Sequence, residues 1–322
     1  MSYSFLKYTL QAASLVKTHR ARGRHRRRRT PRACFGELLH IDGSPHGWLA
    51  LRPTARAVLI AVLDDATKRV LYAQLWAGET TVAIMTALRA VITTHGLPMA
   101  VYTDRAHWAF HTPQAAGPVD RRPRTQVGRA LERLGIEHIP AYSPQARGRS
   151  ERLNRTFQDR LVNELRVAQI TTLPAANAYR RDRFVPDYNA TFSCAPADPA
   201  SAFVALGKVD LDQILCHQEE RVVMQDNTIA FAGRIFQIAR QPGRRSCAGL
   251  KVIIRRHLTG EYSIWAAARR LGRYPAISER TRDRRAAVQP VEAAGAVDAK
   301  NAPTAAGKRT ATRFPQLPQA SL

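Results

Sequence analysis

Short apolar runs alternate with stretches of helical periodicity in the first half of the chain, and their order predicts an α/β fold. Apolar runs that predict strands occupy residues 38–42, 57–63, 69–75, 101–104 and 136–141. Helical spacing predicts helices over 80–95 and 126–134, and a third helix that starts near Ser150, after a loop marked by Ser143-Pro144 and Gly148. The second and third strands flank a polar turn and should form a hairpin. The sequence therefore predicts a mixed five-stranded sheet with helices on its faces.

The periodicity changes in the second half of the chain. Residues 171–188 predict a helix that Pro186 should kink or end, followed by an irregular stretch at 189–199 and a short helix at 201–206. Between residues 221 and 265 the period becomes two, in five short runs separated by Gly or Asn turns. This pattern predicts a small antiparallel β-barrel.

The two ends of the chain lack such patterns. A short helix is expected within residues 1–16, but residues 17–32 carry nine Lys or Arg and no acid. Such a block cannot bury itself, and it predicts either a disordered phosphate-binding arm or a merely solubilising tail. The predicted organisation is a basic arm at 1–34, a main α/β domain at 35–206, a small barrel at 207–270 and a disordered tail at 271–322.

Charge identifies the class of partner. Lys and Arg total 50 against 25 acids, which gives a net charge of +25. This excess predicts a polyanionic partner, and nucleic acid fits because neutralised phosphates release counterions. A membrane partner would require an amphipathic basic helix or an apolar span of about 18 residues, and the sequence shows no such span. Four cysteines without a CxxC pair, and no signal peptide, predict reduced thiols in a cytoplasmic protein.

Three acids hold similar places in the predicted fold. Asp42 ends the first strand, Asp104 ends the fourth, and Glu151 opens the helix after the fifth. Three converging carboxylates repel one another unless cations lie between them, and Mg²⁺ prefers such oxygen ligands. Two ions about 3.5–4 Å apart can activate an attacking oxygen and stabilise a leaving oxygen in phosphodiester chemistry. The alternative is that these are unrelated strand-end and helix-cap acids, with Glu151 paired to neighbouring arginines.

Several motifs around these acids resemble those of bacterial insertion-sequence transposases of the retroviral-integrase superfamily. The resemblance covers about residues 30–265, and it is carried by residues 35–44 (FGELLHIDGS), 63–67 (LDDAT), 102–104 (YTD), 143–156 (SPQARGRSERLNRT), and Tyr188-Asn189 followed by Ala195-Pro196. It implies an RNase H-like integrase catalytic core with Asp42, Asp104 and Glu151 as the DDE catalytic and metal-binding residues. The small barrel also resembles the one that follows the core in related transposases.

The resemblance further implies what such a protein does. Two Mg²⁺ (or Mn²⁺) ions per site would support strand cleavage at transposon ends and transfer of the 3′-hydroxyl to target DNA. The expected partner is double-stranded DNA, bound by a homo-oligomer in the bacterial cytoplasm at the nucleoid. Residues assigned to DNA contact are the arginines beside Glu151 and those of the basic arm: Arg147, Arg149, Arg152, Arg155, Arg26, Arg27, Arg28 and Arg29.

The sequence departs from the family pattern at three points. Asp104 and Glu151 are separated by 47 positions, about a dozen more than is usual, and the Pro-, Gly- and Ala-rich loop at 107–125 accounts for the excess. Gln158 stands where a basic residue is common, so Arg155 or Arg160 is expected to contact phosphate instead. A helix-turn-helix domain of about a hundred residues normally comes first, whereas residues 1–16 alone precede the arm. We therefore expect a truncated or split element.

Alternatives remain for single residues and for the whole chain. Asp64-Asp65 is either a second metal pair or a structural turn, and we favour the turn. Trp48, Trp108 and Tyr142 either stack on extruded bases or pack in the core, and packing is favoured. Besides the transposase, the sequence is compatible with a catalytically inactive remnant that only binds DNA, and with an RNase H-like nuclease of RNA or DNA junctions.

Overall fold

The computed structural model describes residues 2–13, 29–114, 117–120, 122, 124–142, 144–276 and 287–291. The chain divides into two units, Met1–Pro31 and Arg32–Leu322. In the first unit, helix α1 (Tyr3–Ala12) begins at Ser2, whose hydroxyl accepts a hydrogen bond from the Phe5 amide at 3.3 Å. The short N-terminal helix is confirmed. The predicted arm lies outside the described residues from 14 to 28.

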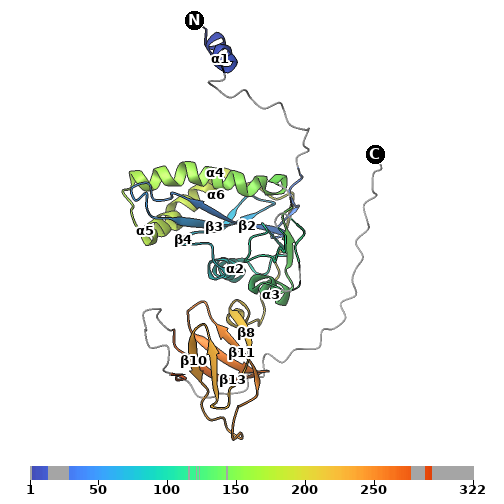
Figure 1. Ribbon diagram of the computed structural model, residues 1–322. Coiled ribbons are helices and arrows are strands. Elements are labelled where there is room, and N and C mark those ends of the chain that lie inside the picture. The colour runs from blue at the N-terminus through green and yellow to red at the C-terminus, as the bar shows by residue number, and fades with distance from the viewer. Residues whose placement is uncertain are drawn as a thin grey trace. The chain divides into compact units, whose positions relative to one another are not determined.

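A mixed five-stranded sheet organises the second unit, as the sequence predicts (Figure 1). Its strand order is β4-β3-β2-β5-β6. The β2–β3 and β3–β4 pairs are antiparallel and include the predicted hairpin, whereas β5 is parallel to both β2 and β6. The strands span β2 (Leu38–His46), β3 (Ala57–Asp64), β4 (Val70–Trp76), β5 (Ala100–Thr103) and β6 (Glu137–Pro140).

Helices cover both faces of this sheet and create two hydrophobic cores (Figure 1). Helices α2 (Thr81–His95) and α3 (Gln126–Arg133) pack on one face, which we call the α2 face. Each begins after a capping threonine, because the side chains of Thr80 and Thr125 accept hydrogen bonds from backbone amides in the first turns. Helix α4 (Pro144–Val167) and the helices after it pack on the opposite face, which we call the α4 face.

Helix α4 begins earlier than the sequence suggests. We expected a loop through Gly148 and a start near Ser150, but the helix starts at Pro144 and includes the glycine. A proline fits the first turn of a helix, where its missing N–H has no partner to lose. One glycine costs a helix about 1 kcal/mol, which burial of Leu153, Phe157 and the leucines of the later turns can offset.

The helical run after α4 also extends beyond its expected end. Helix α5 (Leu173–Tyr179) continues through a π-helical turn at Arg180–Phe184 into α6 (Val185–Phe192). Pro186 does not terminate the run, because it lies in the first turn of α6, where no amide hydrogen bond is needed. The expectation of irregular structure from residue 189 was therefore wrong up to Phe192.

Two asparagines of this helical run form hydrogen bonds with backbone groups of β4, the edge strand of the sheet. The side chain of Asn189 accepts a hydrogen bond from the Val70 amide at 2.8 Å and donates one to the Val70 carbonyl at 3.0 Å. Asn177 bonds both backbone groups of Leu75 in the same way, at 2.8 and 2.9 Å. Edge strand β4 is thus covered by side chains that imitate a neighbouring strand.

A two-stranded parallel sheet replaces the short helix expected at 201–206. Strands β1 (Cys34–Phe35) and β7 (Asp198–Ser201) pair, and Val204 then forms a bridge with Leu97. This geometry brings the ring of Phe203 over Gly36, where it packs on Phe35 with ring centroids 5.0 Å apart. The prediction failed because non-local pairing decides the conformation here.

Replacement of Gly36 by alanine is expected to lower the free energy of unfolding by about 2–4 kcal/mol. Gly36 has φ +83°, and an added Cβ would lie 2.3 Å from Cδ2 of Phe203. The left-handed backbone costs about 1–2 kcal/mol and overpacking about 1–3 kcal/mol. Urea unfolding measures the change. Gly78→Ala is the matched control, because nothing lies within 4 Å of its Cβ position, and equal stability of the two variants would contradict the prediction.

The strand-rich region forms two sheets on a shared core, and a closed barrel is not observed among the described residues. One sheet has the order β13-β12-β11-β8 and the other β14-β10-β9. Both contribute to one core that includes Phe236, Ile254 and Tyr274. The strands are β8 (His217–Val222), β9 (Thr228–Phe231), β10 (Arg234–Gln237), β11 (Lys251–Arg256), β12 (Tyr262–Ala266), β13 (Arg269–Tyr274) and β14 (Ala287–Val288).

Short α7 (Leu211–Ile214) precedes this region and packs into the core on the α2 face. Arg129 of α3 donates hydrogen bonds to the carbonyls of Ile214 and Cys216, at 3.0 and 2.6 Å. The predicted tail lies outside the described residues at 277–286 and 292–322, and the predicted domain limits stay predictions.

Candidate active site

Asp42 and Asp104 occupy equivalent positions on neighbouring parallel strands. The last register pair of β2 and β5 is Ile41 with Thr103, so each aspartate follows directly after this pair. Asp104 follows the last residue of β5, as predicted. Asp42 does not end its strand, because β3 continues to pair with β2 as far as His46. The first aspartate is thus fixed within a strand and is only 5 % exposed, while the second begins a loop.

Asp42 faces helix α4. Asp42 is paired with Ala61, whose side chain belongs to the core on the α4 face, and residues alternate along a strand. A direct contact supports this orientation, because Nδ2 of Asn154 donates a hydrogen bond to Oδ2 of Asp42 at 2.8 Å. One turn further along α4, Gln158 donates to the Ser44 hydroxyl at 2.9 Å. Polar residues of α4 therefore lie along β2 beside Asp42.

Sequence reasoning did not single out Asn154, although a signal was available. It lies three positions after Glu151, so both belong to one stripe of the helix. Its Oδ1 atom is buried and has no hydrogen-bond partner within the described part of the chain. A buried amide oxygen without a donor is unusual, and here it lies beside the Asp42 carboxylate.

Glu151 lies in the N-terminal part of α4, one turn before Asn154, and its side chain is exposed. Across the described residues, no group of three or more His, Cys, Asp or Glu side chains is close enough to hold a metal ion. The structure thus brings Asp42 and Asp104 to adjacent register positions, and it places Glu151 on the helix that contacts Asp42.

The proposed metal-binding residues carry the oxygen atoms that hard divalent cations prefer. Asp42, Asp104 and Glu151 offer carboxylate oxygens, and the Oδ1 atom of Asn154 is a further oxygen that lacks a donor. Mg²⁺ and Mn²⁺ bind such oxygen ligands, whereas Zn²⁺ sites favour Cys and His. The residues present therefore fit Mg²⁺ or Mn²⁺.

Asp64 and Asp65 hold the turn between β3 and β4, as favoured from the sequence. Both are fully buried. Asp64 accepts hydrogen bonds from the amides of Gly36 and Thr67, at 2.9 and 2.8 Å, and from the Thr67 hydroxyl. Asp65 makes longer-range contacts, which include Nε2 of His40 at 2.8 Å and the guanidinium of Arg149.

The arginines near Glu151 differ in their surroundings. Arg149 is directed at Asp65, with Nε 3.2 Å from Oδ1 and a side chain that is 14 % exposed. Arg152 donates to the Gly148 carbonyl of its own helix at 3.0 Å, and Arg155 is exposed. Arg160 pairs with Glu164 and lies over the ring of Phe184, so it is part of the packing between helices. Arg155 has the position best suited to meet phosphate.

Two of the three candidate stacking residues are buried. Trp48 is fully buried and donates to the Ser44 carbonyl at 3.0 Å, and Trp108 donates to the Glu79 carboxylate at 2.6 Å. Both tryptophans pack in the protein interior, which is the alternative favoured from the sequence. Tyr142 is 58 % exposed, and the guanidinium of Arg105 lies 5.3 Å from its ring centroid.

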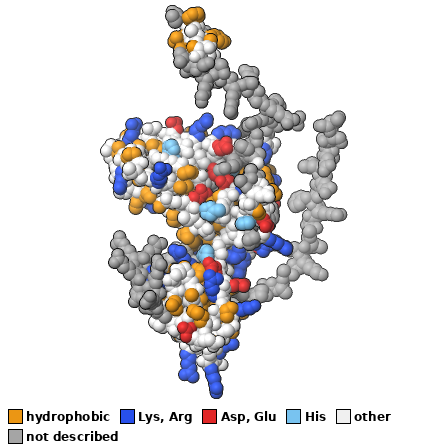
Figure 2. Space-filling model, in the orientation of Figure 1, with side chains coloured by type: hydrophobic (Ala, Val, Ile, Leu, Met, Phe, Trp, Pro, Cys, Tyr) orange, Lys and Arg blue, Asp and Glu red, His pale blue; other side chains and the backbone are white. Residues whose placement is uncertain are grey.

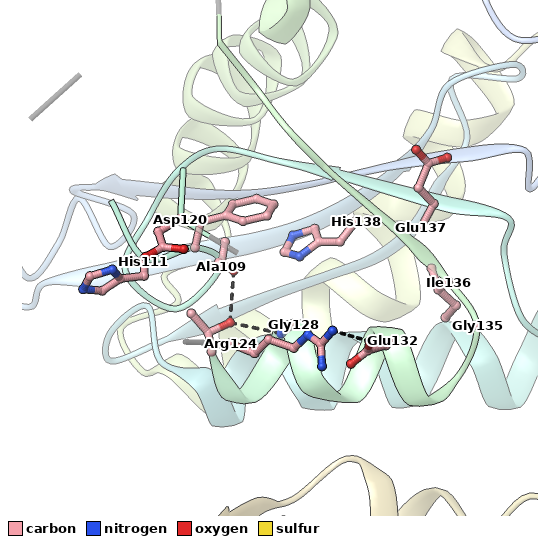
Figure 3. A pocket seen from close by; sticks show the side chains of 12 residues that line it. Ala109, His111, Asp120, Arg124, Gly128, Glu132, Gly135, Ile136, Glu137 and His138 are labelled. Carbon is pink, nitrogen blue, oxygen red and sulfur yellow. Dashed lines mark hydrogen bonds and ion pairs between the residues drawn. The ribbon is translucent and has the colours of Figure 1, made fainter. Parts of the chain in front are cut away.

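A cavity of about 410 Å³ lies beside helix α3 (Figure 3). It is lined by residues of the 107–125 loop, of α3 and of β6, including His111, Asp120, Glu132 and His138. The ring of His138 stacks on Phe110 with centroids 4.0 Å apart, and its Nε2 lies 2.9 Å from the hydroxyl of Thr103, the residue before Asp104. The cavity thus borders the strand that positions Asp104.

Basic side chains occur over much of the described surface seen in Figure 2. Their distribution agrees with the composition, in which the positive charge is spread along the chain. Arg26, Arg27 and Arg28 of the arm lie outside the described residues, and Arg29 is described. No helix within the described ranges is long and apolar enough to cross a membrane.

Two curated proteins resemble the chain in sequence. "Putative transposase y4bF" of Sinorhizobium fredii is 31 % identical over 266 residues, which is 82 % of this chain and 57 % of that protein. "Transposase for insertion sequence IS1202" of Streptococcus pneumoniae is 33 % identical over 208 residues, which is 64 % of this chain and 43 % of that protein. The chain thus spans about half the length of these relatives. No family model matches the sequence.

Two solved structures show weaker similarity. A simian T-cell lymphotropic virus intasome in complex with PP2A regulatory subunit B56 gamma covers 57 % of this chain, with 65 % of its own chain matched, 17 % identity and a TM-score of 0.36. The HTLV-2 integrase catalytic core domain in complex with magnesium covers 47 % of this chain, with 90 % of its own chain matched, 16 % identity and a TM-score of 0.34. Both TM-scores are below 0.5, so these similarities add no support to a function.

Proposed function

The chain is a homologue of insertion-sequence transposases, and we propose on this basis that it is a DDE transposase that cuts and joins DNA with divalent metal ions. Asp42, Asp104 and Glu151 would hold two Mg²⁺ or Mn²⁺ ions. The bound ions would supply charge stabilisation for the attacking and leaving oxygens of the phosphodiester. The reaction class is hydrolysis at the transposon end, followed by transfer of the 3′-hydroxyl to target DNA.

One observation carries the proposal more than any other. Two aspartates that are 62 positions apart in sequence follow the same register pair of neighbouring parallel strands, and the first of them contacts the helix that bears Glu151. Unrelated strand-end acids have no reason to meet in this way. Asn154 supports the same site, because it holds the Asp42 carboxylate from α4 and leaves an oxygen beside it.

The chain's own residues would bind and orient the DNA. Exposed Arg155 follows Glu151 by one turn, and Arg152 lies between them, so a phosphate beside the metal ions would meet guanidinium groups. Arg147 and the basic arm, with Arg26 to Arg29, would add sequence-independent contacts to the backbone of double-stranded DNA. We propose a homo-oligomer on DNA because transposition joins two ends to one target.

A strand-transfer assay tests the proposal. Purified protein, a labelled duplex carrying the inverted repeat that flanks the gene, and supercoiled target DNA are incubated with Mg²⁺ or Mn²⁺. Wild type should nick the repeat and join it to the target, while Asp104→Asn and wild type with EDTA should do neither. If wild type and Asp104→Asn both bind the duplex but neither cuts it, the chain acts by occupying DNA ends. Structure-selective cutting of RNA or DNA junctions would indicate a nuclease instead.

A further inference from the structure

A buried network beside the proposed site joins helix α4 to strand β2 through Asp65. This residue is fully buried and lies at the turn between β3 and β4. Its Oδ1 atom lies 2.8 Å from Nε2 of His40 and 3.2 Å from Nε of Arg149. Its Oδ2 atom accepts a hydrogen bond from the Arg32 amide at 2.8 Å. One carboxylate therefore binds three segments of the chain.

The partners of Asp65 are close neighbours of the proposed catalytic acids. His40 lies two positions before Asp42 on β2, on the same side of the strand. Arg149 lies two positions before Glu151 on α4, and its Nη1 also donates to the backbone carbonyl of Asp65. The network thus connects the strand that carries the first acid to the helical turns that carry the third.

Other contacts of α4 do not replace this connection. Leu153, Phe157, Leu161 and Leu165 anchor the later turns in the core on the α4 face. Asn154 contacts Asp42, one turn after Glu151. Before Glu151, Arg149 links α4 to the sheet through its contacts with Asp65, and Glu151 itself is exposed.

We propose that Asp65 is a positioning residue that sets the N-terminal turns of α4, and with them Glu151, relative to Asp42. Two fixed points on Arg149, a carboxylate oxygen and a carbonyl oxygen, define the direction of its guanidinium plane. Arg149 then serves to orient the helix and is not a phosphate contact. This inference rests on the proposed function, because it gives Glu151 its place in the metal site. Loss of a residue that orients a metal site without binding the metal itself typically lowers activity by about 10- to 100-fold.

Asp65→Asn tests the inference, with Asp64→Asn as the matched control. Both substitutions remove one buried charge from the same turn, but the Asp64 carboxylate bonds Gly36 and Thr67 and, among the described residues, none of α4. For folded protein, Asp65→Asn should lower the turnover of strand transfer by about 10- to 100-fold with little change in DNA affinity. Asp64→Asn should lower stability while its folded fraction keeps near wild-type turnover.

Hydrogen exchange gives a readout that does not depend on activity, metal or DNA. In Asp65→Asn, the amides of residues 148–151, the first that can bond within α4, should exchange faster than in wild type, while those of residues 154–165 keep their protection. In Asp64→Asn, any faster exchange in these two segments should be no greater than the loss of global stability of that variant explains. If Asp65→Asn and Asp64→Asn show the same exchange along α4, Asp65 supports only the turn and the inference fails.

Arg149→Gln keeps the inference testable if Asp65→Asn does not fold. It removes the other partner of the same link, and it should produce the same faster exchange at residues 148–151 and the same loss of turnover. Unchanged exchange in Arg149→Gln would overturn the inference. A wild-type protein that never transfers strands would remove the proposed function, while the exchange measurements would still decide whether Asp65 fixes the start of α4.

Discussion

Glu151→Gln is expected to reduce metal-dependent strand transfer by at least about 10³-fold, an effect of roughly 4 kcal/mol on the barrier. Glutamine has nearly the same shape but carries no charge, so the proposed site would lose one of three carboxylates that neutralise and orient two divalent ions. Glu151 is exposed, so the substitution should leave the free energy of unfolding within about 0.5 kcal/mol of wild type. A large loss of activity without a loss of stability is the specific expectation.

Asp159→Asn is the matched control for this prediction. It removes an exposed acid from the same helix, two turns after Glu151, and the Asn163 side chain bonds its backbone carbonyl and not its carboxylate. Its transfer rate should stay within about twofold of wild type. DNA affinity measured without metal should not fall in either variant, because removal of a negative charge cannot weaken attraction to phosphate. Near wild-type transfer by Glu151→Gln would exclude a third carboxylate ligand at this position.

Strands and helices with local signals were predictable from the sequence. The hairpin, α2 and α3 each combine a periodic apolar pattern with a turn or a capping threonine, and the structure confirms them. The convergence of Asp42 and Asp104 was expected from their places at the ends of the first and fourth strands, and the pairing of β2 with β5 puts them at adjacent register positions. The acids as metal ligands remain a prediction, which the resemblance and the register support without testing it.

Other features depend on tertiary structure that no local pattern encodes. Asp42 lies inside β2 because β3 continues to pair beyond it. The helical run passes Pro186 because a π-helical turn precedes it, and a sequence window does not show that turn. Residues 201–206 include the last residue of β7 and the bridge at Val204, whose pairing partners lie far away in sequence. Asp65 was predictable as a turn residue, but its contact with Arg149 joins residues 84 positions apart.

Phe157→Ala is expected to lower the free energy of unfolding by about 3–5 kcal/mol, the largest effect on stability that we predict. Phe157 is fully buried on α4, and its ring centroid lies 4.8 Å from that of Phe184 and 5.2 Å from that of Tyr188. Truncation removes both aromatic contacts and leaves a cavity between α4 and the π-helical run. Chemical denaturation measures the change.

Arg155→Ala separates the packing role of α4 from its role in binding DNA. Arg155 lies two positions before Phe157 but is exposed, so its loss should change the free energy of unfolding by no more than about 0.5 kcal/mol. If it meets a phosphate, the slope of log affinity against log salt should decrease in magnitude by about 1. For Phe157→Ala, the folded fraction should keep the wild-type salt slope. Phe157 belongs to the core on the α4 face, whereas Arg155 is exposed. An equal loss of stability in both variants would therefore contradict the packing described for α4.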